Sequence, residues 1–211
     1  MWHGSLLNSG ISSYLKGELP TLVTILMHHL VLLTSRLEDG NQGIDLSEPY
    51  RLSRVFGLTP DQKTFIFKMM QSLLPTRDRL ARMRKIQSSS CLYCDEIADS
   101  TAHLLTCSHS SEVSDRLMNC LTSYFPNISP EEIVILNIPV TESLELPVVW
   151  LLSTCMGYIW EQRVMGKMAR LDICRAELLA KLMLLRNTKW RHYTLHNSAV
   201  LLGDIINLHF T

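Results

Sequence analysis

Between residues 91 and 107 the sequence CLYCDEIADSTAHLLTC contains four side chains of the types that bind transition metals. Cys91 and Cys94 form a Cys-x-x-Cys pair, and His103 is followed by Cys107. A Cys-x-x-Cys turn directs two thiolates into one knuckle, and a histidine and a cysteine at this spacing lie on one face of a helical turn. Thiolate and imidazole ligands favour Zn²⁺ in a tetrahedral site. The spacing therefore predicts a zinc site.

The predicted zinc ion is structural. Three cysteines and one histidine fill a tetrahedron and leave no position for a catalytic water. Leu104 and Leu105, between the last two ligands, are expected to point into a local core. Two alternatives remain open at this point. In the first, no metal binds, the cysteines are free thiols and His103 is a surface residue. In the second, zinc binds but His109 replaces Cys107 as the fourth ligand.

Other active sites have little support in the sequence. A cysteine nucleophile with a histidine base would require a supporting glycine-rich turn or oxyanion motif, and we find neither. The nine glycines are scattered and form no phosphate-binding loop. Cys120, Cys155 and Cys174 lie on apolar helical faces, where small core residues are expected. We therefore predict no catalytic residue and no enzymatic activity for this chain.

The formal net charge of zero conceals two charged blocks. Residues 60–90 carry seven basic and two acidic side chains, whereas residues 91–150 carry one basic and nine acidic side chains. The basic residues nearest the metal motif are Arg77, Arg79, Arg82, Arg84 and Lys85. A positive face of this kind contacts the phosphates of RNA or DNA and releases counterions. The alternative is a solvated helix face paired with the acidic block.

Helical periodicity predicts a mainly α fold, a small helical bundle with a zinc-knuckle insertion. Thr59, Pro60 and Gln62 fit a capping box that begins a helix with apolar positions up to Leu74. A basic helix is expected over residues 76–86. These elements would place the basic side chains directly before the cysteine knuckle.

Further helices are expected after the knuckle. Ser129 begins a second capping box, and residues 133–138 fit either a helix end or a short strand. Apolar helices are predicted from Pro147, over about 170–186 and over about 199–208. These helices would form the body that holds the knuckle.

The length of 211 residues suits one medium domain or two small ones. We divide the chain into an apolar N-terminal helix and linker (1–43), a helical segment with the basic helix (44–90), the zinc knuckle (91–125) and a C-terminal helical region (126–211). The apolar run 22–33 is too short to span a bilayer and lacks the basic flank of a signal peptide. The uneven cysteine spacing argues against a disulfide framework. We expect an intracellular protein, cytoplasmic or nuclear, that does not enter a membrane.

The order of these features resembles the zinc-binding region near the C-terminus of non-LTR (LINE-type) retrotransposon reverse transcriptases. In LTPDQKTFIFKMMQSLLPTRDRLARMRKIQSSSCLYC, residues 58–94, an amphipathic helix, a Leu-Pro-Thr break and an arginine-containing helix precede the knuckle. The His-Leu-Leu element at 103–105 and Cys107 also match. YIWEQR (158–163) and RAELLAKLMLLR (175–186) are similar to the helical tail of some members. The resemblance covers roughly residues 50–211.

This sequence departs from the family in two respects. The family usually has four residues between its histidine and its last cysteine, whereas His103 and Cys107 are separated by three. No Tyr-x-Asp-Asp or similar aspartate pair of the polymerase palm occurs, so the two catalytic metal ions cannot be held. We also see no acidic and lysine cluster of an endonuclease. The resemblance implies that this region binds template RNA or target DNA without catalysing a reaction.

Three functions remain compatible with the sequence. The first is a nucleic-acid-binding module derived from the C-terminal part of a reverse transcriptase. The second is a zinc-stabilised scaffold whose apolar C-terminal helices, with Trp150, Trp160 and Leu178, bind a protein partner. The third is a non-functional remnant of a decayed element. The first two predict different binding surfaces, the basic segment and the C-terminal helices respectively.

Overall fold

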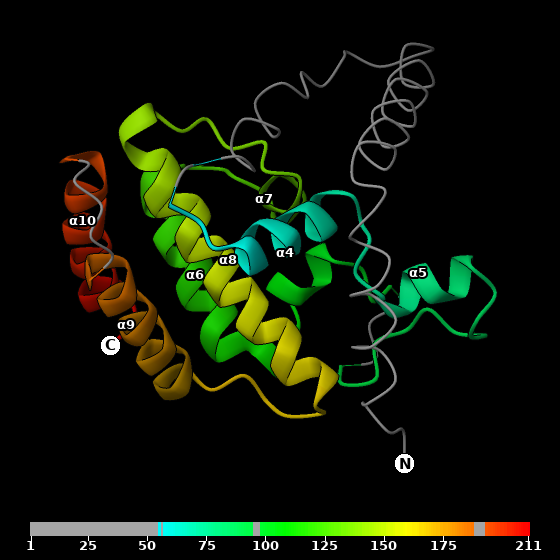
Figure 1. Ribbon diagram of the computed structural model, residues 1–211. Helices are drawn as coiled ribbons and strands as arrows, with labels where there is room; N and C mark the ends of the chain where they lie inside the picture. The colour runs from blue at the N-terminus through cyan, green and yellow to red at the C-terminus, as the bar shows by residue number, and fades with distance from the viewer. Residues whose placement is uncertain (1–54, 56, 95–97, 188–192) are drawn as a thin grey trace, which may run out of the picture. The chain divides into compact units, whose positions relative to one another are not determined.

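The computed structural model describes residues 55, 57–94, 98–187 and 193–211, all of which belong to one compact unit, Leu46–Thr211. The predicted N-terminal helix and linker lie outside these residues. Over the described ranges the chain is helical and contains no strand, which confirms the mainly α prediction (Figure 1). The helices are α4 (Pro60–Met70), α5 (Arg77–Arg82), α6 (Ser111–Tyr124), α7 (Pro130–Val134), α8 (Glu142–Val164), α9 (Leu171–Asn187) and α10 (Tyr193–His209), with 3₁₀ turns η1 (Ala102–Leu105) and η2 (Ser108–Ser110).

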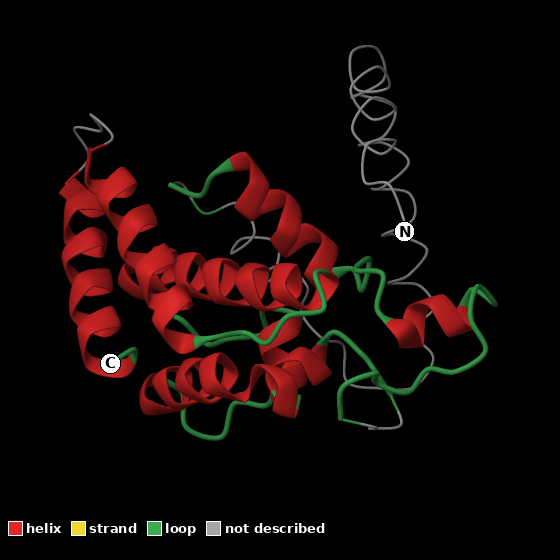
Figure 2. Ribbon diagram, turned by 90° about the horizontal axis from the view of Figure 1, so that it is seen from below, coloured by secondary structure: helices red, strands yellow, loops and turns green. Residues whose placement is uncertain are grey.

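Helix α8 is the centre of the unit. It contacts α4, α6, α9 and α10 as well as η1. Figures 1 and 2 both show α5 at one end of the unit and α9 and α10 at the other. The segment Ser143–Val164 is long and apolar enough to cross a membrane, but 72% of its apolar 18-residue stretch is buried inside the protein. A helix that is apolar on all sides and covered by other helices is a core helix.

The zinc-knuckle region shares the core of the bundle. Leu104 and Leu105 of η1 are almost fully buried, which confirms that they point inward. The turn η1 packs against α6, α7 and α8. Cys120, Cys155 and Cys174 are buried in the same apolar cluster, as their helical positions predicted. The knuckle is therefore an integral part of the fold, because its own leucines complete the core.

Both predicted capping boxes are present. The Thr59 hydroxyl accepts from the Gln62 N–H at 3.2 Å, and the Thr59 N–H donates to the Gln62 side chain at 2.9 Å. Ser129 and Glu132 make the same reciprocal pair at 3.2 and 2.9 Å. These bonds satisfy backbone N–H groups that a helix start leaves without partners. The stretch 133–138 contains the end of α7 and no strand.

The basic helix is shorter than predicted. Residues 76–86 were expected to be helical, but α5 ends at Arg82. Arg84 adopts a left-handed conformation with φ of 56°. The N–H groups of Arg84 and Lys85 donate to carbonyls in α5 at 2.8 and 2.9 Å, which closes the helix. Arg84 and Lys85 therefore lie in a turn beyond the helix.

The long central helix also begins elsewhere than predicted. Pro147 was expected to open it, but α8 begins at Glu142 and Pro147 lies inside. Proline at this depth cannot donate to the carbonyl one turn earlier. The burial of the following turns, including Val149 and Leu152, offsets this loss. Tertiary packing therefore decides where this helix starts.

Candidate metal centre

The structure brings the four predicted ligands together. Cys91 and Cys94 lie on the turn that follows the α5 segment, His103 lies in η1, and Cys107 lies between η1 and η2. Their ligand atoms all lie within 4.8 Å of one another. Two local elements, a turn and a 3₁₀ helix, are sufficient to make this cluster.

The distances within the cluster fit a tetrahedral zinc site. Cys91 Sγ and Cys107 Sγ are 3.8 Å apart, and Cys107 Sγ and Cys94 Sγ are 3.7 Å apart. Two sulfurs bound to one zinc at ~2.3 Å lie about 3.8 Å from each other. The His103 Nε2 atom lies 3.2 Å from Cys94 Sγ. The ligand types and their distances thus fit a closed structural Zn²⁺ site, which confirms the predicted zinc site.

The orientation of His103 suits metal binding. Its Nε2 atom faces the cysteines, whereas Nδ1 lies 3.4 Å from the hydroxyl of Thr106. Metal-bound histidines usually have a partner on the outer ring nitrogen, which fixes the ring and its tautomer. The backbone N–H of His103 donates to the Ser100 hydroxyl at 3.1 Å. Neighbouring polar side chains thus hold the ring in place.

Cys107, and not His109, completes the cluster. The His109 ring stacks on Tyr93 with 4.0 Å between ring centroids, and its Nε2 atom lies 2.7 Å from the Lys167 carbonyl. Cys107 is held inward because its N–H donates to the His103 carbonyl at 2.8 Å. The 3₁₀ turn between the two ligands accommodates the short three-residue gap.

Arg163, which sequence reasoning did not identify, contacts the ligand sulfurs. It comes from the last turn of α8 and is 9% exposed. Its guanidinium donates to Cys91 Sγ at 3.1 Å and to Cys107 Sγ at 3.7 Å, and it pairs with buried Asp99. Three thiolates around a divalent ion leave one surplus negative charge. Arg163 supplies positive charge where that surplus lies.

These contacts change the acidity of the groups involved. Burial alone would raise the pKa of the Cys91 thiol, but hydrogen bonds from the Tyr93 backbone, Arg163 and His103 outweigh it and lower the pKa to about 6. Burial would lower the pKa of Arg163, but its bonds to Cys91 and Asp99 raise it above the ordinary value. Cys91 binds a metal ion as the thiolate, and the lowered pKa favours this form.

Asp99 and Tyr93 connect the knuckle to α5 and α8. The Asp99 carboxylate accepts from the backbone N–H of Arg77 at 3.2 Å, and its carbonyl accepts from the N–H of Asp78 at 3.2 Å. The Tyr93 hydroxyl donates to the Arg163 carbonyl at 3.0 Å, and its ring lies 5.0 Å from the guanidinium carbon. The start of α5 is thereby fixed beside the metal centre.

The five basic residues singled out in the sequence fall into two groups. Arg77 and Arg79 are half-buried, and their side chains donate to the backbone carbonyls of Ser90 at 2.7 Å and of Ser72 at 3.1 Å. Arg82, Arg84 and Lys85 are exposed. Arg82 pairs with Asp78 of the same helix at 2.8 Å. The exposed charge is thus concentrated at the end of α5 and in the turn beyond it.

Comparison with known families supports the metal centre. Residues 55–113 match the family model described as zinc-binding in reverse transcriptase. The match includes α4, α5 and all four ligand positions. No curated protein and no solved structure matches the chain. Residues 55–113 are thus a zinc-binding region of the kind associated with reverse transcriptases, and Arg163 lies outside the matched stretch.

Proposed function

We propose that the protein is a non-catalytic module that binds RNA or DNA, derived from the C-terminal part of a non-LTR retrotransposon reverse transcriptase. The match to a reverse-transcriptase zinc-binding family supports this relationship. Zinc acts as a structural ion that fixes the basic segment. Arg77, Arg79, Arg82, Arg84 and Lys85 contact phosphates.

The observation that carries the proposal is the exposure of Arg82, Arg84 and Lys85 at the end of α5 and in the turn beyond it, while the start of α5 is held by Asp99 of the knuckle. Among the described residues, the side chains of Arg84 and Lys85 make no hydrogen bond or ion pair. Positive charges presented together on a fixed backbone attract phosphates and release counterions. Asp99 supports this arrangement because it accepts from the N–H at the start of α5.

Binding can be measured by fluorescence anisotropy of the zinc-loaded full chain with labelled RNA and DNA of one sequence, single-stranded and duplex, over a salt series. The affinity is expected to fall linearly with salt on a logarithmic scale. The triple variant Arg82→Ala, Arg84→Ala, Lys85→Ala should reduce the magnitude of that slope by about 2 to 3, because each lost phosphate contact contributes roughly 0.7 to 0.9.

A matched control removes the same charge elsewhere. The variant Lys63→Ala, Lys167→Ala, Arg170→Ala loses three exposed cations from α4 and from the segment between α8 and α9. It should keep the slope of the unmodified protein. Equal losses in both variants would point to a diffuse charge effect, and no binding by the zinc-loaded protein would exclude the proposed function.

A further inference from the structure

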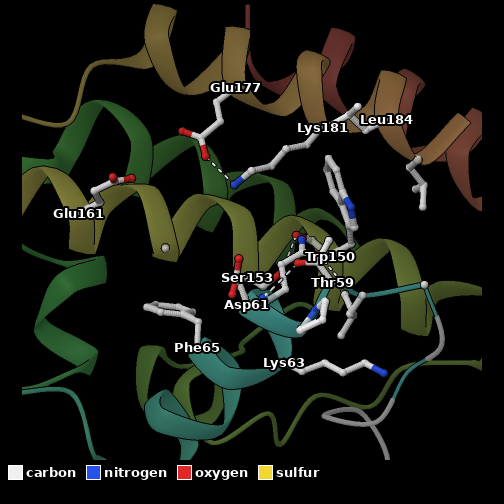
Figure 3. Close-up of a pocket in the computed structure, with 16 residues that line it drawn as sticks. Thr59, Asp61, Lys63, Phe65, Trp150, Ser153, Glu161, Glu177, Lys181 and Leu184 are labelled. Atoms are coloured by element: carbon white, nitrogen blue, oxygen red, sulfur yellow. Dashed lines mark hydrogen bonds and ion pairs between the residues drawn. The ribbon is translucent and has the colours of Figure 1, made fainter. Parts of the chain in front are cut away.

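A cavity of about 670 Å³ lies over α8, between α4 and α9. In Figure 3 α8 forms its floor, with Phe65 and Asp61 on the α4 side and Lys181 and Leu184 on the α9 side. Both α4 and α9 pack on α8. None of the four metal-binding residues lines this cavity, which we call the α8 groove.

The floor of the α8 groove follows one face of the helix. Trp150, Ser153, Gly157 and Glu161 line it at spacings of three and four residues. Such spacings place side chains in a single stripe. At 1.5 Å per residue the stripe is ~16 Å long, or about three helical turns. The α8 groove is therefore elongated along a helix axis, and its length matches a short helix.

Gly157 lies in the middle of this floor, and no side chain of the described residues packs over it. A glycine weakens a helix interior, but it lets another group approach the helix backbone closely. Gly203 of α10 has such a neighbour, because an added Cβ would lie 2.7 Å from the Arg186 side chain. An added Cβ at Gly157 would meet nothing within 4 Å. The space over Gly157 is left for an occupant that approaches the α8 backbone.

Acidic side chains line the α8 groove at the Glu161 end and, through Asp61, nearer its middle, whereas Lys63 lies toward the Trp150 end. Figure 3 shows Glu161 and Glu177 toward one end, whereas Lys63 extends on the Trp150 side. Glu177 already pairs with Lys181. Glu161 is exposed, and its carboxylate makes no hydrogen bond or ion pair with the described residues. An occupant with a cation at one end and an anion at the other would complement these charges.

We propose that the α8 groove binds an amphipathic α-helix of a partner protein. Helix-in-groove recognition uses apolar anchors at positions i, i+3, i+4 and i+7, which span about two turns. The anchors pack over Trp150, Gly157 and the side chains of Phe65 and Leu184. A lysine or arginine of the partner reaches Glu161, and an acidic residue reaches Lys63. This interaction is separate from the proposed nucleic-acid contact.

The test uses synthetic 14-residue helical peptides with four leucines at the anchor positions, lysine at one end and glutamate at the other. Their binding to the zinc-loaded full chain is followed by fluorescence anisotropy. The patterned peptides should bind at least about tenfold more tightly than scrambled peptides of the same composition. Equal binding of patterned and scrambled peptides would overturn the proposal.

Gly157→Leu provides the decisive variant. An added Cβ at Gly157 meets nothing within 4 Å and the rest of the leucine would extend into the cavity that Gly157 lines, so the variant should fold and melt at or above the temperature of the unmodified protein. Peptide binding should fall about tenfold or more because the floor is filled. Asn119→Leu, on an exposed face of α6, adds a leucine to a helix and should leave binding unchanged. Unchanged binding by folded Gly157→Leu would contradict the proposal.

Exchanging the charges of Glu161 and of the peptide lysine tests the orientation of the bound peptide. Glu161→Lys should weaken the lysine-bearing peptide about fivefold or more, and a peptide with glutamate in place of that lysine should recover the loss. A small apolar dye, anilinonaphthalene sulfonate, tests the alternative that the α8 groove binds small molecules. If the dye binds the unmodified protein but not Gly157→Leu, and no patterned peptide binds, the α8 groove is a small-molecule site and the helix proposal is wrong.

Discussion

Arg163 donates a hydrogen bond to Cys91 Sγ at 3.1 Å, although the two residues are 72 positions apart. The same guanidinium reaches Cys107 Sγ and pairs with buried Asp99. All four metal-binding residues lie within 91–107, but the cation that offsets their negative charge comes from the end of the core helix α8. The metal centre and the packing of the bundle therefore depend on each other.

The first prediction concerns this contact. Arg163→Gln should lower the affinity for zinc about 10- to 100-fold, the usual cost of losing a partner of a metal ligand. Arg163→Lys should recover only part of the loss, because an ammonium group cannot contact both sulfurs and Asp99 as the planar guanidinium does. Competition with a chromophoric chelator at fixed pH measures the affinity of each variant.

Arg170→Gln is the matched control for this measurement. Arg170 is 62% exposed, and its guanidinium pairs with Asp172. Removing it takes the same charge from the chain without touching a ligand sulfur. Its zinc affinity should remain within about twofold of the unmodified protein. A loss as large as that of Arg163→Gln would mean that general charge, rather than the sulfur contacts, controls zinc binding.

The ligands were predictable from the sequence because the site is local. Cys91 and Cys94 lie at one turn, His103 lies in η1 and Cys107 lies between η1 and η2, so the spacing of these residues carries most of the geometry. The capping box at Thr59 is local for the same reason. Arg163 could not be found in this way, because only the packing of α8 brings it to the sulfurs.

The helix boundaries show a second limit of sequence reasoning. α5 ends in a left-handed conformation at Arg84, and α7 ends in the same way at Leu136. Glycine is the usual signal for such an end, and neither position has it. The predicted start of α8 at Pro147 was wrong for a different reason. Proline commonly marks the first turn of a helix, but here the helix begins earlier and continues past Pro147 because α8 is buried. Leu136 and most of α8 are buried, so tertiary packing overrides local preference there, whereas α5 buries no residue and is closed by its own backbone hydrogen bonds.

The second prediction distinguishes the two candidates for the fourth ligand. Cys107→Ala should lose zinc, whereas His109→Ala should retain one zinc per chain, because the His109 ring stacks on Tyr93 outside the cluster. Loss of this stacking should cost only about 0.5 to 1.5 kcal/mol of folding stability. Metal analysis after gel filtration under reducing conditions gives the stoichiometry. Zinc loss from His109→Ala with retention in Cys107→Ala would reverse the assignment.

The third prediction compares a buried and an exposed ion pair. In the Asp99–Arg163 pair the side chains are 3% and 9% exposed, so Asp99→Asn leaves a buried cation without its carboxylate. Arg163 keeps its contacts with the sulfurs of Cys91 and Cys107, so the free energy of unfolding should fall by roughly 1.5 to 3 kcal/mol, the usual contribution of a hydrogen bond to a charged group. Asp172→Asn removes the partner of Arg170 from a pair whose side chains are 64% and 62% exposed, and should cost less than about 1 kcal/mol. Urea denaturation of the zinc-loaded variants measures both, and similar losses would contradict the proposed role of Asp99.

The last prediction concerns removal of the metal. Cys91→Ser with Cys94→Ser should abolish zinc binding and lower the melting temperature, because three thiolates can no longer form and the turn that positions Asp99 loses its anchor. Cys120→Ala is the control, since burial raises the pKa of the Cys120 thiol to about 12 and it remains a protonated core residue. This variant should keep one zinc per chain while losing some core packing. Metal analysis and circular dichroism melts follow both effects. One zinc retained by the double serine variant would show that the cluster is not the binding site, because hydroxyl groups do not replace thiolates as ligands for this ion.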